Sequence, residues 1–327
     1  MALTDERTPD IPVGLRDAIL SWYDQARRDL PFRRTRDPYA ILVSEAMAQQ
    51  TQAARAGDAW ARFMERFPTV EALAAATPAD VLRAWHGLGY NRRALNLWRA
   101  ARSIVDVHDG LVPSDLAALE ALPGVGPYTA RAVAALAFAM PVGAVDTNVR
   151  RVLGRIVAGD AGTLGAAALQ SVADAAVPPD RPGPWTHALM DLGASLCGPR
   201  TPLCEPCPAR TWCRFARSGQ GRNRFARSAP SAKRGARSGA RSGTIPRPTT
   251  APFPATSRWL RGQIVNRLRA SEADDWIVIE APIGSHDERA VRAALTGLAR
   301  DGLVELEVAT EVADTDRSRW VVRLPLA

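Results

Sequence analysis

The chain contains a single lysine and four cysteines, and the cysteines are confined to one short segment. Lys233 is the only lysine among 42 basic residues in the 327-residue sequence. The only cysteines are Cys197, Cys204, Cys207 and Cys213, a number too small for a disulfide-built secreted scaffold. No apolar run approaches the ~18 residues of a membrane span, and no apolar signal segment opens the sequence. We therefore expect a cytoplasmic protein without a membrane anchor.

Acidic residues are missing from one long segment, positions 206–271, whereas ten basic residues fall between positions 214 and 247. The net charge of +8 therefore arises largely in this segment. Its composition of Gly, Ser, Pro and Arg buries too little apolar area to fold, so residues 215–256 are predicted to be a flexible linker. An arginine-rich linker binds phosphate backbones without sequence preference. A solvated linker in an arginine-biased sequence is the alternative.

The four cysteines follow the spacing C-x6-C-x2-C-x5-C. Four thiolates in one loop, residues 197–213, can surround one metal centre, while small disulfide loops would add little to a chain of this length. Zinc ribbons pair two C-x2-C knuckles, and this array has only one. Iron–sulfur loops tolerate uneven spacing. The spacing therefore favours a [4Fe–4S] cluster over a four-thiolate zinc site or free thiols.

Helical patterns fill the sequence up to Cys213. Helices are predicted at positions 38–54 and 129–140, and short loops join the helical segments, which favours an all-α domain over residues 1–214. Within it, the segment Leu-Pro-Gly-Val-Gly at positions 122–126 predicts a tight hairpin between two helices. Its glycines allow the turn and bring backbone amides up to a phosphate. An ordinary helix–turn–helix elbow is the alternative.

From position 257 the pattern changes. A helix, a short strand, a second helix at about 287–301 and two strands at 303–308 and 320–324 predict a small α+β module over residues 257–327. This order suggests a winged-helix-like module, and its second helix is the candidate to bind in a groove of DNA. A small packing cap without a DNA role is the alternative.

Two carboxylates are candidates for chemistry. Glu45 lies among apolar residues on a predicted helix, and Asp146 precedes a predicted helix start. Two carboxylates in different environments can divide the acid and nucleophile roles at a glycosidic bond. The plainer interpretations are a solvated helix face for Glu45 and a helix N-cap for Asp146.

Five motifs occur together in one order. They are Ser44-Glu45-x-Met47-x-Gln49-Gln50-Thr51, Gly87-Leu88-Gly89-Tyr90, Leu122-Pro123-Gly124-Val125-Gly126, Val145-Asp146-x-Asn148-Val149-x-Arg151-Val152 and the cysteine array. In this combination the chain resembles the MutY-type adenine DNA glycosylases of the helix-hairpin-helix superfamily. The resemblance implies a helix-hairpin-helix glycosylase fold with an iron–sulfur loop and a [4Fe–4S] cluster. It also implies a monomer that acts on double-stranded DNA with mispaired adenine.

The resemblance assigns catalytic roles to four residues. The family's counterpart of Glu45 protonates the adenine, and the counterpart of Asp146 stabilises the cationic sugar as the glycosidic bond breaks. Asn148 would orient Asp146 or water. Tyr128 stands where lyase-competent relatives have the lysine that forms a Schiff base, so the resemblance implies base release without efficient strand cleavage.

The remaining matched positions concern DNA. Tyr90 matches the family's intercalating tyrosine, which stacks where the duplex is opened. The other positions implied to contact DNA or the base pocket are Arg33, Gln50, Thr51, Gly124, Val125, Gly126 and Asp191. Residues 257–327 look too short for the family's usual Nudix-like C-terminal domain, so a preference for 8-oxoguanine over guanine opposite adenine is not implied.

Two other functions remain open at this point. A thymine or uracil mismatch glycosylase is the nearer one, because some such relatives also carry a tyrosine at the position of Tyr128. Glu45 argues against it, since a pyrimidine needs less leaving-group protonation. A non-enzymatic iron–sulfur redox sensor that binds promoter DNA is the more distant one.

Overall fold

The computed structural model describes residues 11–160, 162–219, 252–271, 275–308 and 319–326. Contacts within the chain define two compact units. Unit 1 contains residues 1–49 and 112–233, and unit 2 contains residues 50–111 and 234–327. Most of the predicted linker lies outside the described residues, and the domain limits at 214 and 256 stay a prediction. Among the described helices, none is both long and apolar enough to cross a membrane.

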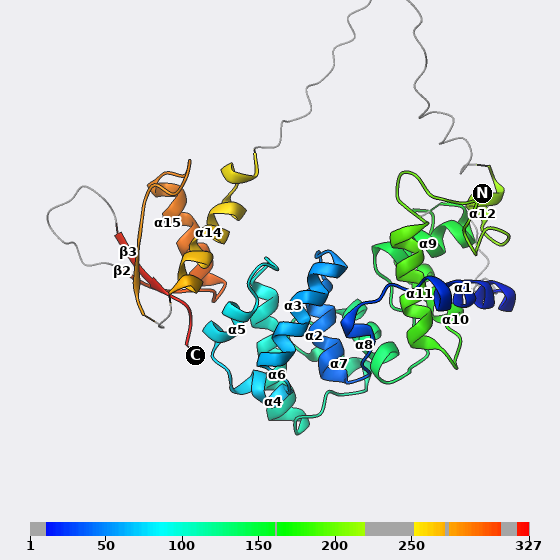
Figure 1. Cartoon of the computed structure of the whole chain (residues 1–327), viewed down its shortest axis with the longest axis horizontal. Coiled ribbons are helices and arrows are strands. Elements are labelled where there is room, and N and C mark those ends of the chain that lie inside the picture. Colours follow the sequence, from blue (N-terminus) through cyan, green and yellow to red (C-terminus); the bar gives the residue numbers. More distant parts are fainter. Residues whose placement is uncertain (1–10, 161, 220–251, 272–274, 309–318, 327) are drawn as a thin grey trace, which may run out of the picture. The chain divides into compact units, whose positions relative to one another are not determined.

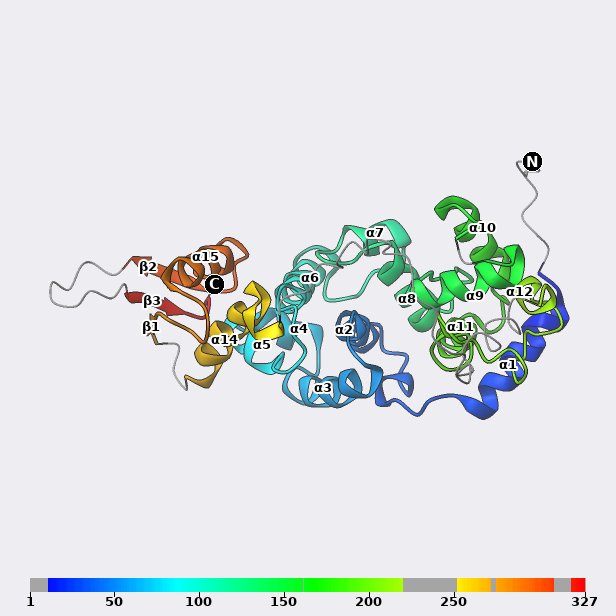
Figure 2. The same ribbon diagram turned by 90° about the horizontal axis from the view of Figure 1, so that it is seen from above.

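The described part of unit 1 is helical. Its elements are α1 (Val13–Ala26), η1 (Pro31–Arg33), α2 (Pro38–Ala48), α7 (Leu116–Ala121), α8 (Pro127–Ala137), α9 (Thr147–Ala158), α10 (Ala166–Ala176), α11 (Pro182–Ser195) and α12 (Arg214–Arg217). Figures 1 and 2 both show α1, α9, α11 and α12 grouped together, and these helices contact one another. Ile19, Val152 and Trp185 are buried in the core between them.

The predicted hairpin joins α7 to α8. Gly124 has a φ of 79°, a left-handed conformation that glycine adopts without strain. The turn is closed by the Val125 amide, which donates to the Leu122 carbonyl at 3.0 Å. Pro127 then occupies the first turn of α8, where its missing N–H costs nothing. The hairpin prediction is therefore confirmed, although α8 ends at Ala137, before the predicted limit.

The single helix predicted for positions 38–54 is wrong. α2 ends at Ala48 and α3 begins at Ala53. Gln50, between them, has a φ of 54°, which lies in the left-handed region and cannot continue a right-handed helix. The apolar periodicity carried no sign of this break, because the residues on both sides favour helix.

Unit 2 combines helices with a small sheet. Its elements are α3 (Ala53–Arg66), α4 (Val70–Ala75), α5 (Pro78–Ala84), α6 (Arg92–His108), η2 (Phe253–Ala255), α14 (Ser257–Ala270), β1 (Ile277–Glu280), α15 (Glu288–Arg300), β2 (Glu305–Val308) and β3 (Arg319–Arg323). α4 and α5 both pack on α6.

The C-terminal module is the part of unit 2 from η2 onward. β3 is the central strand of an antiparallel sheet of order β1-β3-β2, with Val322 opposite both Ile277 and Leu306. Trp320 and Val322 are buried, and α14 packs on α15. The predicted helices and strands of this module are confirmed, while its winged-helix character stays a prediction.

Candidate active site

Glu45 lies in the last turns of α2 and is only 8% exposed. Tyr128, in the first turn of α8, donates a hydrogen bond from its hydroxyl to Glu45 Oε2 at 2.9 Å. The two residues meet because α2 packs directly on α8. The interpretation of Glu45 as part of a solvated helix face is therefore wrong.

Burial raises the pKa of Glu45 to about 7. The hydrogen bond from Tyr128 and the positive charge of Arg33 oppose this increase, while the negative charge of Asp146 adds to it. Because a buried carboxylate loses its hydration, the neutral acid is favoured. Glu45 can therefore hold a proton at neutral pH and donate it, which is the property that a general acid needs.

Asp146 is the N-cap of α9, as the plainer interpretation of the sequence suggested. Its Oδ1 accepts from the Val149 amide at 2.7 Å, and its Oδ2 accepts from Asn148 Nδ2 at 2.9 Å. Both carboxylate oxygens are thus held in place by donors. Asp146 also lies close enough to raise the pKa values of both Glu45 and Tyr128. The structure therefore brings the two candidate carboxylates and Tyr128 into one region of unit 1.

Hydrogen bonds connect Asp146 to the start of the cysteine loop. Asn148, which donates to Asp146, accepts from Arg151 Nη2 at 2.8 Å. Arg151 also donates to the Gly193 carbonyl at 2.7 Å and to the Cys197 carbonyl at 2.6 Å. A Cβ on Gly193 would lie 2.6 Å from Asn148 Cβ, so the close approach of α9 and α11 requires this glycine. Arg151 was quoted in a sequence motif but received no role, although its spacing of i+3 places it on the Asn148 side of α9.

Asp191, on α11, binds two arginines. It is 2% exposed, and Arg33 approaches it with both terminal nitrogens, at 2.7 and 2.8 Å. Arg28 donates to the same carboxylate from Nε at 2.6 Å. Burial works against ionisation, but the hydrogen bonds and charges of Arg33 and Arg28 outweigh it and lower the pKa of Asp191. Sequence analysis selected Arg33 and Asp191 but missed Arg28, which belongs to none of the motifs.

A cavity of about 210 Å³ adjoins this ion-pair cluster. Phe32, Arg33, Ser44 and His187 are among the residues that line it. Burial and the charge of Arg33 lower the pKa of His187 to about 3, so this imidazole is neutral at physiological pH. Among the described residues, nothing pairs with the buried Nε of Arg33. The cavity is therefore lined by a cation that Asp191 holds in place, next to the helix that carries Glu45.

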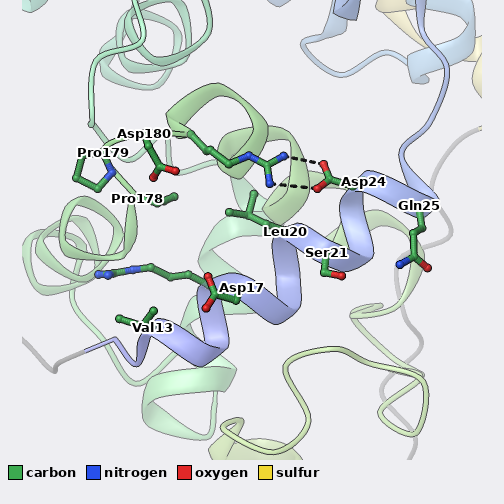
Figure 3. Close-up of a pocket in the computed structure, with 11 residues that line it drawn as sticks. Val13, Asp17, Leu20, Ser21, Asp24, Gln25, Pro178, Pro179 and Asp180 are labelled. Atoms are coloured by element: carbon green, nitrogen blue, oxygen red, sulfur yellow. Dashed lines mark hydrogen bonds and ion pairs between the residues drawn. The ribbon is translucent and has the colours of Figure 1, made fainter.

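A larger hollow of about 480 Å³ lies between α1 and the loop before α11 (Figure 3). Three of its charged groups have partners. Arg181 pairs with Asp24 at 2.7 Å, as the dashed lines in Figure 3 mark, and Arg16 donates to the carbonyls of Ala175 and Ala176. None of the sequence-predicted site residues lines this hollow.

The four cysteines lie in the segment after α11. Burial raises the pKa of Cys207 to about 12, and the sulfurs of Cys197, Cys213 and Cys204 add to the increase, so all four are close together. Arg155, 5% exposed, donates to Cys197 Sγ at 3.2 Å and was missed by sequence analysis. No three His, Cys, Asp or Glu side chains in the described ranges are placed to hold one metal ion. Four thiols are the donor set that both iron–sulfur clusters and thiolate zinc sites use. These residues therefore fit the group that the resemblance implies in donor chemistry, though not in the arrangement of their side chains.

The predicted DNA-contacting residues are divided between the units. Tyr90, Gln50 and Thr51 lie in unit 2, where the Tyr90 side chain is exposed and Thr51 accepts from Arg93 at 3.4 Å. In unit 1, Gly124 and Gly126 of the hairpin are exposed. Val125 is buried and its amide already donates within the turn. The hairpin therefore presents its glycines, not Val125, to solvent.

Residues 43–164 match the model of the HhH-GPD superfamily base excision DNA repair protein. The fold is similar to a thermostable thymine-DNA glycosylase, with a TM-score of 0.59 and 32% identity, over 62% of this chain and 95% of that one. It is also similar to endonuclease III in a trapped covalent complex with DNA, with a TM-score of 0.55, 25% identity and coverage of 63% and 95%. The helical part thus has the fold of base excision DNA glycosylases.

Proteins of similar sequence identify the family within this class of DNA glycosylases. The adenine DNA glycosylase of Mycolicibacterium smegmatis is 42% identical over 289 residues, which cover 88% of this chain and 91% of that protein. The adenine DNA glycosylase of Mycobacterium tuberculosis is 42% identical over 258 residues, 78% of each chain. The chain therefore belongs to the adenine DNA glycosylase family and is a DNA glycosylase of base excision repair.

Proposed function

We propose that this enzyme hydrolyses the N-glycosidic bond of adenine mispaired with 8-oxoguanine or guanine in double-stranded DNA, and that it leaves the strand intact. The observation that carries this proposal is the buried Glu45, whose pKa is raised to about 7 beside the Asp146 carboxylate. Such a pair supplies a proton donor and a negative charge to one glycosidic bond.

The two carboxylates act on opposite ends of the bond. Glu45 donates its proton to a ring nitrogen of the extruded adenine, so the base departs as a neutral molecule with the bonding electrons. The sugar C1′ becomes cationic, and the Asp146 carboxylate, held by Asn148 and the Val149 amide, stabilises that charge. Water then adds to C1′ and returns its proton to Glu45. The adenine must first leave the stack, at a cost of a few kcal/mol.

The Arg33 cavity is the proposed base pocket. Arg33 gives this pocket a fixed positive charge, and Asp191 holds its guanidinium through both terminal nitrogens. Because Arg33 is held before the base arrives, it needs no reorganisation on binding. Asp191 and Arg28 therefore support recognition without touching the base.

Strand cleavage through a Schiff base needs an amine near the sugar. Tyr128 occupies the place where lyase-competent relatives have lysine, and it hydrogen-bonds to Glu45 instead. The described residues contain no lysine, because Lys233 lies outside them. We expect an abasic site as the product.

Cys197, Cys204, Cys207 and Cys213 are proposed to hold a [4Fe–4S] cluster. When bound, the cluster would fix the fold of this loop and would contribute no atom to the reaction. Arg155 and Arg151 anchor the loop through Cys197. Iron and sulfide analysis of the purified protein tests this assignment, and stoichiometric zinc in their place would contradict it.

Tyr90, Gln50, Thr51 and the glycines of the hairpin are proposed as DNA contacts. The exposed ring of Tyr90 suits stacking at the opened base pair. The hairpin suits a phosphate, because its backbone turns tightly before the N-terminus of α8. We expect a monomer in the cytoplasm.

A panel of duplexes tests the function. Purified full-length protein is incubated with duplexes that contain A:8-oxoG, A:G, T:G or U:G, and abasic sites are revealed by alkali. Strand breaks from the A:8-oxoG and A:G duplexes only after alkali support the proposal. Release of thymine or uracil alone would indicate a mismatch glycosylase instead. Strand breaks without alkali would contradict the monofunctional mechanism.

A further inference from the structure

The loop that carries Tyr90 has a constrained backbone. Tyr90 has a φ of 46° and follows Gly87 and Gly89, with φ values of 84° and 66°. Trp85 Nε1 donates to the Gly89 carbonyl at 3.1 Å, and Arg93 donates to the Leu88 and Gly89 carbonyls at 3.1 and 3.2 Å. These bonds fix the backbone on which the Tyr90 side chain stands. The ring itself remains 42% exposed.

The C-terminal module contacts this loop at three consecutive residues. Arg258 of α14 places its guanidinium carbon 4.2 Å from the centre of the Tyr90 ring, Arg269 donates to Asn91 Oδ1 at 2.9 Å, and Asp301 lies 3.8 Å from Arg92. A backbone hydrogen bond from the Ala79 amide to the Pro325 carbonyl, at 2.9 Å, joins the module to α5 of the same unit. The module is therefore attached to unit 2 both beside Tyr90 and on α5.

Burial at this contact is substantial. It lowers the pKa of Arg269 to about 10, and its Nε lies buried without a hydrogen-bond partner among the described residues. Burying an arginine costs free energy unless its donors are hydrogen-bonded, and the hydrogen bond from Arg269 to Asn91 offsets part of this cost. Arg258, by contrast, is exposed. Its guanidinium lies over the ring of Tyr90, the residue that the proposed mechanism stacks at the opened base pair.

We propose that Arg258 is a positioning residue for Tyr90, held in place by the docked C-terminal module, and that it orients the ring for entry into the opened duplex. This inference rests on the proposed function, in which Tyr90 stacks at the extruded adenine. An exposed tyrosine on a turn samples several rotamers, and ordering it during binding costs affinity. A guanidinium stacked on the ring orders it before DNA arrives.

The competing role for Arg258 is a direct contact with a DNA phosphate, which would change the salt dependence of binding. Each neutralised phosphate contributes about −0.9 to the slope of log affinity against log salt. A residue that acts only through the Tyr90 ring changes the opening of the base pair and leaves this slope unaltered. Its effect also disappears when the ring is removed, because two residues that act as one unit are not additive.

The test compares full-length wild type, Arg258→Met, Tyr90→Ala and the double variant. Duplexes carry 2-aminopurine beside an adenine opposite 8-oxoguanine, so fluorescence reports unstacking whether or not the base is released. Arg319→Met is the matched control, because Arg319 is an exposed arginine of strand β3 in the same module and pairs with Glu280, from Nε to Oε1 at 3.0 Å. A stacked guanidinium at an exposed site corresponds to about two- to fivefold in an equilibrium constant.

We expect Arg258→Met to lower the unstacked fraction and the single-turnover rate about two- to fivefold, with an unchanged salt slope. In the Tyr90→Ala background it should change neither, and Arg319→Met should match wild type in both. Arg258→Lys should recover at least half of the loss, since a cation remains over the ring. Equal losses in both backgrounds, or a slope reduced by about 0.9, would overturn the proposal. A wild type that unstacks the duplex but releases no adenine would refute the proposed function alone.

Discussion

Glu45 and Asp191 are both acidic, both buried and both on helices of unit 1, yet their pKa values move in opposite directions. Glu45 has one neutral hydrogen-bond donor, Tyr128, and burial raises its pKa to about 7. Asp191 has two arginines, and its pKa is lowered although its side chain is also buried. Burial alone therefore does not determine protonation. The neighbouring groups also determine it. Glu45, beside a neutral tyrosine, retains its proton, whereas Asp191, beside two arginines, is ionised and binds them.

The largest expected effect follows from removing the proton of Glu45. Glu45→Gln should reduce single-turnover adenine release by about 10²–10⁴-fold, because positioned acid catalysis contributes that much. DNA affinity should stay close to wild type, since glutamine fills the same space beside Tyr128. Binding to an uncleavable duplex is the control. Full activity in Glu45→Gln would remove Glu45 from the mechanism.

The second prediction concerns the anchoring carboxylate. Asp191→Asn should destabilise the fold by about 3 kcal/mol, because it leaves the buried Arg33 without a counter-charge. Thermal unfolding measures this. Asp29→Asn is the matched control: Asp29 pairs with Arg34 at the surface, where both side chains are at least 70% exposed, and its loss should barely move Tm. A similar Tm for both variants would contradict the comparison.

The third prediction is a pH dependence of stability. The pKa of Glu45 is raised from 4.5 to about 7 on folding, so between these values the folded state binds more protons than the unfolded state. Stability from this group is present below pH 4.5 and is lost as pH rises towards 7, by on the order of 3 kcal/mol. Glu45→Gln has no such loss. We expect it to be more stable than wild type at pH 8 and similar near pH 4, as measured by denaturant unfolding at both values.

The smallest effect is expected from Tyr128→Phe. The Tyr128 hydroxyl stabilises the ionised form of Glu45, so removing it should move the alkaline limb of the pH–rate profile upward by about one pH unit. At pH 7 the rate should change by no more than about twofold, because the acid form is only modestly more populated. A limb that moves downward, or a tenfold loss at every pH, would give Tyr128 a different role.

Sequence predicted much of this site and missed what depends on packing. The motifs located Glu45, Asp146 and Asn148, and local capping chemistry placed Asp146 at the start of α9. The raised pKa of Glu45 was not predictable, because it results from the packing of α2 on α8. Arg28 was missed because its link to Asp191 joins residues far apart in the chain.

The fold shows the same division. The hairpin and the order of elements after position 257 were predictable from glycines and apolar periodicity. The break at Gln50 was not, since its left-handed backbone is set by the surrounding fold and not by local preference. The contact between Arg258 and Tyr90 joins two segments that no pattern in the sequence relates.

Titration of the Glu45 carboxyl group tests the central claim most directly. The carbonyl stretch of a protonated carboxylic acid is followed by infrared difference spectroscopy across pH 4–9, with Glu45→Gln subtracted to isolate this residue. We predict a band that disappears with a midpoint near pH 7, in accord with the raised pKa of Glu45. A midpoint near the ordinary value of 4.5 would show that Glu45 is ionised at neutral pH and would contradict its role as the proton donor.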